Sequence, residues 1–179
     1  MDKQEGDIHT PEILAPAGNR ASFLAAVAAQ ADAIYCGLKS FSARMQAKNF
    51  AMEEFAPLVH LAHEQGIKVF VTINSMLKSD DLLQAGKMLD QLQRLVKPDA
   101  VIFQDLAMVE LVKQTGFSGE IHLSTLANAG FSAALQVIRQ KLGVDRVVLP
   151  RELNIDEIKQ LAAVCPAGLL SRTIASRST

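Results

Sequence analysis

Polar side chains follow the short apolar runs of this sequence, and their types suit the binding of a polar or anionic molecule. Amide and hydroxyl groups supply hydrogen-bond donors and acceptors, and an arginine guanidinium can hold a phosphate or carboxylate with two hydrogen bonds. Arg44 belongs to FSARMQAKNF at 41–50, a segment longer than a connection between neighbouring elements needs. We expect this loop, with Lys39 and Lys48, to reach over the other candidate binding residues. These are Asn19, Asn74, Gln104, His122, Ser124, Thr125, Arg151 and Glu152.

A structural role competes with binding for the asparagines of this chain. Asn19 and Arg20 open the first predicted helix, where free backbone amides make a natural anion site. Capping of helices and turns is nevertheless the commoner task of asparagine, and it applies equally to Asn74, Asn128 and Asn154. Both interpretations stay open for each of them.

The elements that must position these residues alternate between strands and helices. Helical spacing follows each strand, as in Phe55, Leu58, Val59 and Ala62. Strands that are apolar nearly throughout, separated by helices, predict a parallel sheet covered by helices. The six predicted strands lie at 12–15, 33–36, 68–73, 100–103, 120–123 and 146–149.

Two architectures have this alternation, an open doubly wound sheet and a closed eight-stranded barrel. The first turn, APAGNR at 15–20, has one glycine where the dinucleotide-binding fingerprint requires three. Six strand and helix units extrapolate to eight in roughly 220–250 residues, the usual size of a TIM barrel. We therefore predict an α/β fold, a parallel (β/α) TIM-type barrel that is incomplete, with about six of its eight units.

The candidate residues then share one end of the barrel, because the carboxyl ends of its strands carry the chemistry. His122 alternates with Ile121 and Leu123 along a strand, so its ring points either into the barrel or toward a helix. Only the first orientation would be functional, as a titratable or hydrogen-bonding group. The sequence leaves this choice open.

Other reactive residue types do not assemble into a recognised site. His60 and His63 lie one turn apart, but their spacing matches neither zinc-binding helix pattern. Cys36 and Cys165 stand alone, so they form no metal-binding pair, and a lone cysteine is usually a small buried hydrophobe. We assign no catalytic residue and expect no metal ligand in this chain.

Composition excludes several classes of protein. The 179 residues suit one globular domain, and their net charge of -1 gives no overall attraction to nucleic acid or to an anionic membrane. Two cysteines make no disulfide framework, and the polar start MDKQEGDIHT lacks the core of a signal peptide. No apolar stretch approaches the roughly 20 residues of a membrane span. We expect a cytoplasmic protein with no membrane partner.

The end of the chain departs from the barrel pattern. A seventh apolar strand is expected after 156–164, yet LLSRTIASRST is rich in serine, threonine and arginine. We expect a flexible start at 1–10, a partial barrel at 11–166 and an aberrant or disordered tail at 167–179. An unclosed barrel exposes strand edges and interior, which favours self-association. A truncated or frame-shifted product of a longer gene would explain this ending, and a natural disordered tail is the alternative.

Six segments, in order, resemble the N-terminal region of the collagenase-like peptidases, peptidase family U32. The resemblance covers nearly all of 11–166 and independently implies a TIM-type barrel. The segments are PEILAPAGN at 11–19, ADAIYCG at 31–37, FSARMQAKNF at 41–50, AHEQGIKVFVTIN at 62–74, IHLST at 121–125 and VDRVVLPREL at 144–153.

This resemblance implies two kinds of activity. Some members are described as proteases that degrade collagen, and others resemble iron-sulfur proteins that help hydroxylate RNA pyrimidines or a quinone precursor. We expect a truncated copy of the second kind, inactive by itself, with a small-molecule or RNA substrate. A peptidase acting on collagen-like substrates and a non-catalytic remnant are the alternatives.

The resemblance also bears on the cofactor. It implies a [4Fe-4S] cluster only for a full-length form, held by cysteines beyond the region covered. The chain departs from the family at about Gly168, so we expect no cofactor in this chain itself. The remaining residues also supply no Ser/His/Asp set, no Cys/His pair and no zinc site.

Overall fold

The computed structural model describes residues 11–41, 49–127, 129–165 and 169–171. Within these residues, seven parallel strands form one sheet whose spatial order is the chain order. This order requires a crossover connection after each strand, which the intervening helices provide. The strands are β1 (Leu14–Ala17), β2 (Ala33–Gly37), β3 (Lys68–Ile73), β4 (Ala100–Phe103), β5 (Glu120–Leu123), β6 (Arg146–Val148) and β7 (Leu170–Ser171).

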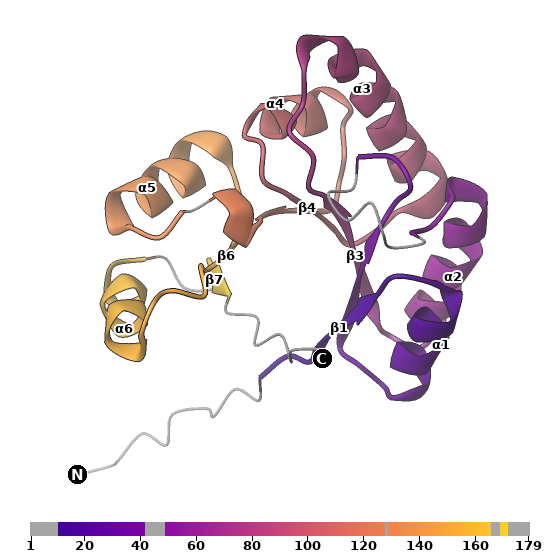
Figure 1. The fold of residues 1–179 in the computed structure, drawn as a ribbon, viewed down its shortest axis with the longest axis horizontal. Helices are drawn as coiled ribbons and strands as arrows, with labels where there is room; N and C mark the ends of the chain where they lie inside the picture. The colour runs from indigo at the N-terminus through magenta and orange to yellow at the C-terminus, as the bar shows by residue number, and fades with distance from the viewer. Residues whose placement is uncertain (1–10, 42–48, 128, 166–168, 172–179) are drawn as a thin grey trace.

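The helices form an outer layer around the curled sheet (Figure 1). Helices α3 and α5 continue as single π-helical segments at Leu92–Val96 and Ile138–Leu142, and 3₁₀ turns lie at Ser79–Asp81 and Thr125–Ala127. No helix among the described residues has the length and apolar character needed to span a bilayer. The α-helices are α1 (Arg20–Ala28), α2 (Met52–Glu64), α3 (Leu82–Gln91), α4 (Ala107–Gln114), α5 (Ser132–Val137) and α6 (Ile155–Val164).

The curled parallel sheet confirms the predicted incomplete TIM-type barrel (Figure 1). Strands β3, β4 and β5 begin and end where the apolar runs predicted. β1 begins two residues later than predicted and includes Pro16. It is the first strand of the sheet order, and a proline without an N–H donor is tolerated in an edge strand. β7 lies inside the predicted tail, where Leu169 is buried and Leu170 pairs with Val147.

The sheet has two faces of different composition. Side chains on the helix-facing side of the sheet pack under the helices in the main core, as Val69, Val71 and Ile73 of β3 do. Alternate residues point to the concave inner face, where Phe70 packs with Ala33, Ala100 and Ile102. The period of two along each strand therefore separates structural residues from those that line the barrel interior.

An aspartate stands just before each of the strands β2, β4 and β6. Its carboxylate accepts a hydrogen bond from a backbone N–H at the start of the preceding strand. Charge-assisted bonds of this kind are stronger than those between neutral groups. They lock the pairs β1–β2, β3–β4 and β5–β6 at their amino ends. The donors are Ile13 N to Asp32 at 2.7 Å, Val69 N to Asp99 at 2.7 Å and Ile121 N to Asp145 at 2.9 Å.

Three buried phenylalanines join the first two helices to the end of β2. The ring of Phe55 in α2 lies 5.3 Å from that of Phe50 and 6.4 Å from that of Phe23 in α1. Phe50 in turn pairs with Leu38, directly after β2. The rings of Phe23 and Phe50 meet edge to face, 6.1 Å apart, an arrangement favoured by the ring quadrupoles.

Candidate functional site

Three predicted binding residues gather at the carboxyl ends of β3, β4 and β5. Asn74, Gln104 and Ser124 each follow a strand at a position whose alternation directs the side chain to the inner face. The amide nitrogen of Gln104 donates to the backbone carbonyl of Asn74 at 3.1 Å. Ser124 is buried, and its backbone N–H donates to the carbonyl of Phe103 at 2.8 Å. We refer to Asn74, Gln104 and Ser124 as the amide layer.

The amide layer contains one polar atom without a protein partner. Oδ1 of Asn74 is buried, and no hydrogen-bond donor reaches it within the described part of the chain. A buried acceptor left unsatisfied costs about 1–3 kcal/mol, so native proteins rarely retain one without a water, an ion or a ligand to satisfy it. The arrangement is therefore suited to accept a hydrogen bond from a bound molecule.

Asp105 holds the backbone on both sides of the amide layer. Its two carboxylate oxygens accept from Leu77 N and Ala107 N, each at 3.0 Å. The first bond anchors the segment that follows Asn74, and the second anchors the start of α4. Asp105 thus acts as a positioning residue. Its place directly after Gln104 at a strand end is the sequence signal that identifies it.

The other predicted residues lie elsewhere or make different contacts. Thr125 begins a 3₁₀ turn beside Ser124, and Arg151 and Glu152 are exposed in the turn that follows β6. Arg44, Lys48 and Asn128 lie outside the described residues. Lys39 is exposed directly after Leu38, at the end of β2.

Two asparagines cap helices, as the structural interpretation proposed. Oδ1 of Asn19 accepts from Ser22 N at 3.0 Å at the start of α1. Oδ1 of Asn154 accepts from Asp156 N and Glu157 N, both at 3.0 Å, at the start of α6. Both helices have a reciprocal capping box, in which the third helical residue bonds back to the cap. Asn19 and Asn154 therefore satisfy helix termini, and they do not join the amide layer.

His122 points into the barrel, where it belongs to a polar cluster near the amino ends of the strands. Its Nε2 donates to Oε2 of Glu120 at 2.6 Å, and its ring lies edge-on to Phe70 with centroids 4.9 Å apart. Arg146 donates to Oε2 of Glu12 at 2.8 Å, a bond between residues 134 positions apart. The guanidinium carbon also lies 5.9 Å from the ring centroid of Phe70. The cluster therefore links β6 to the segment before β1.

Burial makes His122 a source of pH-dependent stability. Only 1% of the residue is exposed, and burial lowers its pKa, an effect that the Glu120 bond partly opposes. As pH falls through about 6.5, the unfolded chain therefore binds the proton before the folded chain does. The stabilising contribution is complete above that pH and is lost below it. We expect the free energy of unfolding to fall between about pH 7.5 and 5.5, less steeply in His122→Gln.

Urea unfolding at a series of pH values measures this difference. His60→Gln is the matched control, because the His60 side chain is 77% exposed and pairs only with Glu64 among the described residues. That variant should keep the pH dependence of the parent protein. Equal slopes for His122→Gln and the parent would contradict the assignment.

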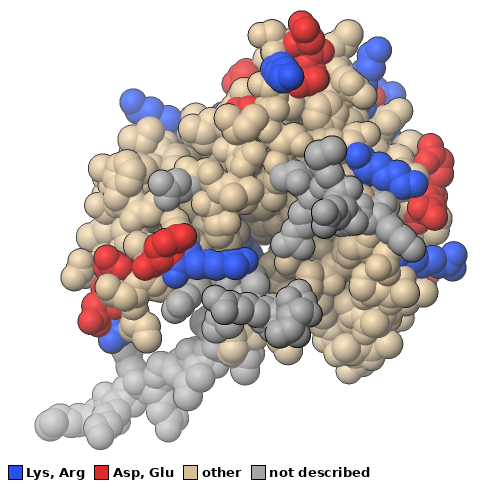
Figure 2. Space-filling model, viewed as in Figure 1, with Lys and Arg blue, Asp and Glu red and all other residues tan. Residues whose placement is uncertain are grey.

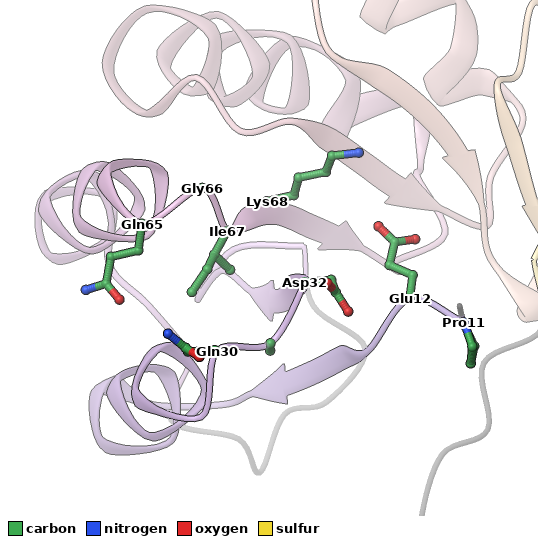
Figure 3. A pocket seen from close by; sticks show the side chains of 9 residues that line it. Pro11, Glu12, Gln30, Asp32, Gln65, Gly66, Ile67 and Lys68 are labelled. Atoms are coloured by element: carbon green, nitrogen blue, oxygen red, sulfur yellow. The ribbon is translucent and has the colours of Figure 1, made fainter. Parts of the chain in front are cut away.

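A polar depression lies at the amino ends of the strands, at the opposite end of the barrel from the amide layer (Figure 3). It encloses about 690 Å³, with the amides of Gln30 and Gln65 at one end and Glu12 and Asp32 at the other. Both carboxylates already have structural partners, Arg146 and Ile13 N. In barrels of this type the amino ends of the strands serve stability, whereas the carboxyl ends carry the chemistry. This depression is therefore structural.

Comparison with known proteins identifies the family. The sequence model that represents peptidase family U32 matches residues 18–169 of this chain. The chain belongs to peptidase family U32. The predicted resemblance is thus confirmed. The solved structure of the U32 peptidase Mk0906 superposes on 96% of this chain and 72% of that chain with a TM-score of 0.72 and 17% identity, which supports the same fold.

Curated members of the family carry two kinds of names. A collagenase of Porphyromonas gingivalis is 31% identical over 151 residues, which are 84% of this chain and 35% of that protein. The 23S rRNA 5-hydroxycytidine C2501 synthase of Escherichia coli is 35% identical over 153 residues, which are 86% of this chain and 22% of that protein. The U32 chain described here thus spans about a third or less of the length of these relatives.

The residues of this U32 chain do not fit the [4Fe-4S] cluster that the resemblance implies for a longer form. Such a cluster is held by four cysteine thiolates, and the chain has two cysteines. Cys36 is buried on the helix-facing side of β2, where burial raises the pKa of its thiol. Cys165 follows α6. Among the described residues, no three His, Cys, Asp or Glu side chains are grouped to hold a metal ion.

The described residues also lack the hydrogen bond that activates a hydrolytic nucleophile. A serine or cysteine nucleophile is activated by a base within hydrogen-bond reach. In the part of the chain that the structure describes, His122 bonds to Glu120 and His63 bonds to Asp99 at 2.9 Å. Among the described residues, the hydroxyl of Ser124 accepts from Leu126 N alone, at 3.4 Å. The amide layer offers hydrogen-bonding groups at the carboxyl ends of the strands.

Proposed function

We propose that this U32 chain binds a pyrimidine nucleotide of RNA at the carboxyl ends of its strands, as the substrate-binding part of an RNA hydroxylation protein. Oδ1 of Asn74, which has no hydrogen-bond partner among the described residues, carries the proposal, because a donor group of a bound ligand would satisfy it. The name of the 5-hydroxycytidine synthase, a relative 35% identical, supports a pyrimidine as that ligand.

The chemistry of the amide layer matches the edge of a pyrimidine base. Cytosine presents an amino donor beside ring and carbonyl acceptors, and enzymes that modify a base read this edge after it leaves the stack. Oδ1 of Asn74 would accept from the exocyclic amine. The hydroxyl of Ser124, at the end of β5, is both a donor and an acceptor. Ile102, on the inner face below Gln104, adds an apolar surface for the base.

Gln104 would hold Asn74 in the binding orientation. Its bond to the Asn74 carbonyl fixes the end of β3 relative to β4, and Asp105 fixes the segment that follows. Binding sites need such support because a displacement of about 1 Å weakens hydrogen bonds strongly. The chain would thus bind the substrate. It would do so in the cytoplasm, where the RNA is found.

The test compares two fluorescent single-stranded RNA oligonucleotides by anisotropy, one of uridines alone, whose bases lack the exocyclic amine, and one with a central cytidine among uridines. We expect the chain to bind the cytidine oligonucleotide more tightly. Asn74→Ala should remove about 1–3 kcal/mol of that discrimination, which is roughly 5- to 150-fold in relative affinity. Gln160→Ala, an exposed amide in α6, is the matched control and should leave the discrimination unchanged.

Two results would contradict the proposal. The first is equal binding of both oligonucleotides by the parent chain. The second is cleavage of gelatin by the purified chain with no RNA binding, which would favour the peptidase alternative suggested by the collagenase relative.

A further inference from the structure

A groove of about 330 Å³ opens at the carboxyl end of β2, between α2 and α3. Its volume lies within the range of small-molecule pockets, roughly 300–1,000 Å³. The floor is apolar, formed by the buried side chains of Leu38, Phe50 and Met88. Lys39 and Lys87 line the groove from two different elements, the end of β2 and α3.

Backbone hydrogen bonds hold this floor in place. The N–H of Phe50 donates to the carbonyl of Gly37 at 3.1 Å, and the N–H of Lys39 donates to the carbonyl of Phe50 at 3.0 Å. The segment around Phe50 therefore pairs with β2 although it is separated from it by the long loop. The packing of Phe50 against Phe23 and Phe55 anchors the floor from below. The floor of the groove is thus tied to β2 and to the core.

The charges of the groove are available to a ligand. Neither Lys39 nor Lys87 forms an ion pair with any residue that the structure describes, and both are exposed. Glu53 is the acidic residue that lines the groove, and Gln84 and Gln91 add neutral donors. On the face of the molecule shown in Figure 2, basic and acidic side chains are interspersed. The positive charge of Lys39 and Lys87 is therefore a local feature of the groove.

We propose that this groove holds a second nucleotide of the same RNA strand, next to the pyrimidine bound at the amide layer. The base would rest on the apolar floor, and its phosphate would lie between Lys39 and Lys87. This proposal rests on the proposed function. Single-stranded RNA fits because its bases are unstacked and combine an apolar face with an anionic backbone.

The position of the groove supports this occupant. β2 and β3 are neighbouring strands, so the groove and Asn74 lie at adjacent strand ends, the groove on the helix-covered side and Asn74 on the inner side. An RNA strand that places one base in the amide layer has its flanking nucleotides at this end of the barrel. The groove would read no sequence, because its floor offers a surface rather than hydrogen bonds to a base edge.

Salt-dependent RNA binding tests the groove separately from the amide layer. The double variant Lys39→Gln/Lys87→Gln is compared with Lys113→Gln/Lys141→Gln, whose lysines lie near the carboxyl ends of the α4 and α5 segments, away from the groove. Both variants lose the same charge. We expect weaker binding only for the groove variant. In a plot of log affinity against log salt concentration, its slope should be shallower by about 0.7 for each phosphate contact that is lost. Its preference for cytidine should be unchanged.

Each other outcome has a defined meaning. Equal affinities and salt slopes for the two double variants, with the cytidine preference intact, would overturn the groove assignment and leave the proposed function standing. Loss of cytidine preference in Asn74→Ala but unchanged salt slope supports two separate subsites. No RNA binding by the parent chain at low salt would overturn both proposals.

Discussion

Replacement of Phe55 by alanine is expected to lower the free energy of unfolding by about 3–5 kcal/mol. The side chain is 0% exposed, and its ring contacts those of Phe23 and Phe50. Truncation removes the buried area and leaves a cavity where α1, α2 and the end of β2 meet. Urea denaturation followed by circular dichroism measures the loss.

Phe131→Ala is the matched control for this prediction. Phe131 is 63% exposed and makes no side-chain capping bond before α5. A surface substitution of this kind changes stability by less than about 0.5 kcal/mol. Comparable losses in both variants would contradict the core position of Phe55. If Phe55→Ala does not fold, Phe55→Leu should show a smaller loss in the same direction.

Replacement of Asp99 by alanine is expected to cost about 2–3 kcal/mol, although the aspartate lies outside the apolar core. Its Oδ2 accepts from Val69 N at 2.7 Å and from His63 Nε2 at 2.9 Å. Val69 is 0% exposed, so loss of the carboxylate leaves its N–H without an acceptor. Asp99→Asn keeps one acceptor oxygen and should cost less. Urea denaturation at neutral pH measures each difference.

Asp90→Ala provides the comparison for a surface carboxylate. Asp90 pairs with Arg94 at 2.8 Å one helical turn away, and both side chains are substantially exposed. Exposed pairs of this kind contribute about 0.3–0.5 kcal/mol. A loss for Asp99→Ala no larger than that for Asp90→Ala would show that the bond to Val69 does not hold β3 against β4.

The strands could be predicted because their signal is local. β3, β4 and β5 are short β-rich runs that follow turns containing Gly, Pro or Asp, and the structure reproduces their limits. The local pattern puts β1 two residues too early, because the alignment of β1 with β2 depends on pairing partners that this pattern does not contain. It does not reveal the short β7 either, because two residues carry no periodic signal.

The candidate site was predicted in part. Parallel strands bring their carboxyl ends together, so Asn74, Gln104 and Ser124 could be named before their contacts were known. Asn19 and Asn154 have bonding partners three residues later, Ser22 and Glu157, and this spacing is a recognisable capping signal. The spacing would have favoured the structural interpretation of both asparagines.

The sequence by itself determined the elements, their order and the end of the barrel where polar residues collect, because periodicity and turn residues act over a few positions. Only the tertiary structure decided that His122 faces inward, that Arg146 reaches Glu12, and that Lys39 and Lys87 line the same groove. These outcomes depend on strand register and on the curl of the whole sheet. Both are set by contacts between residues far apart in the chain.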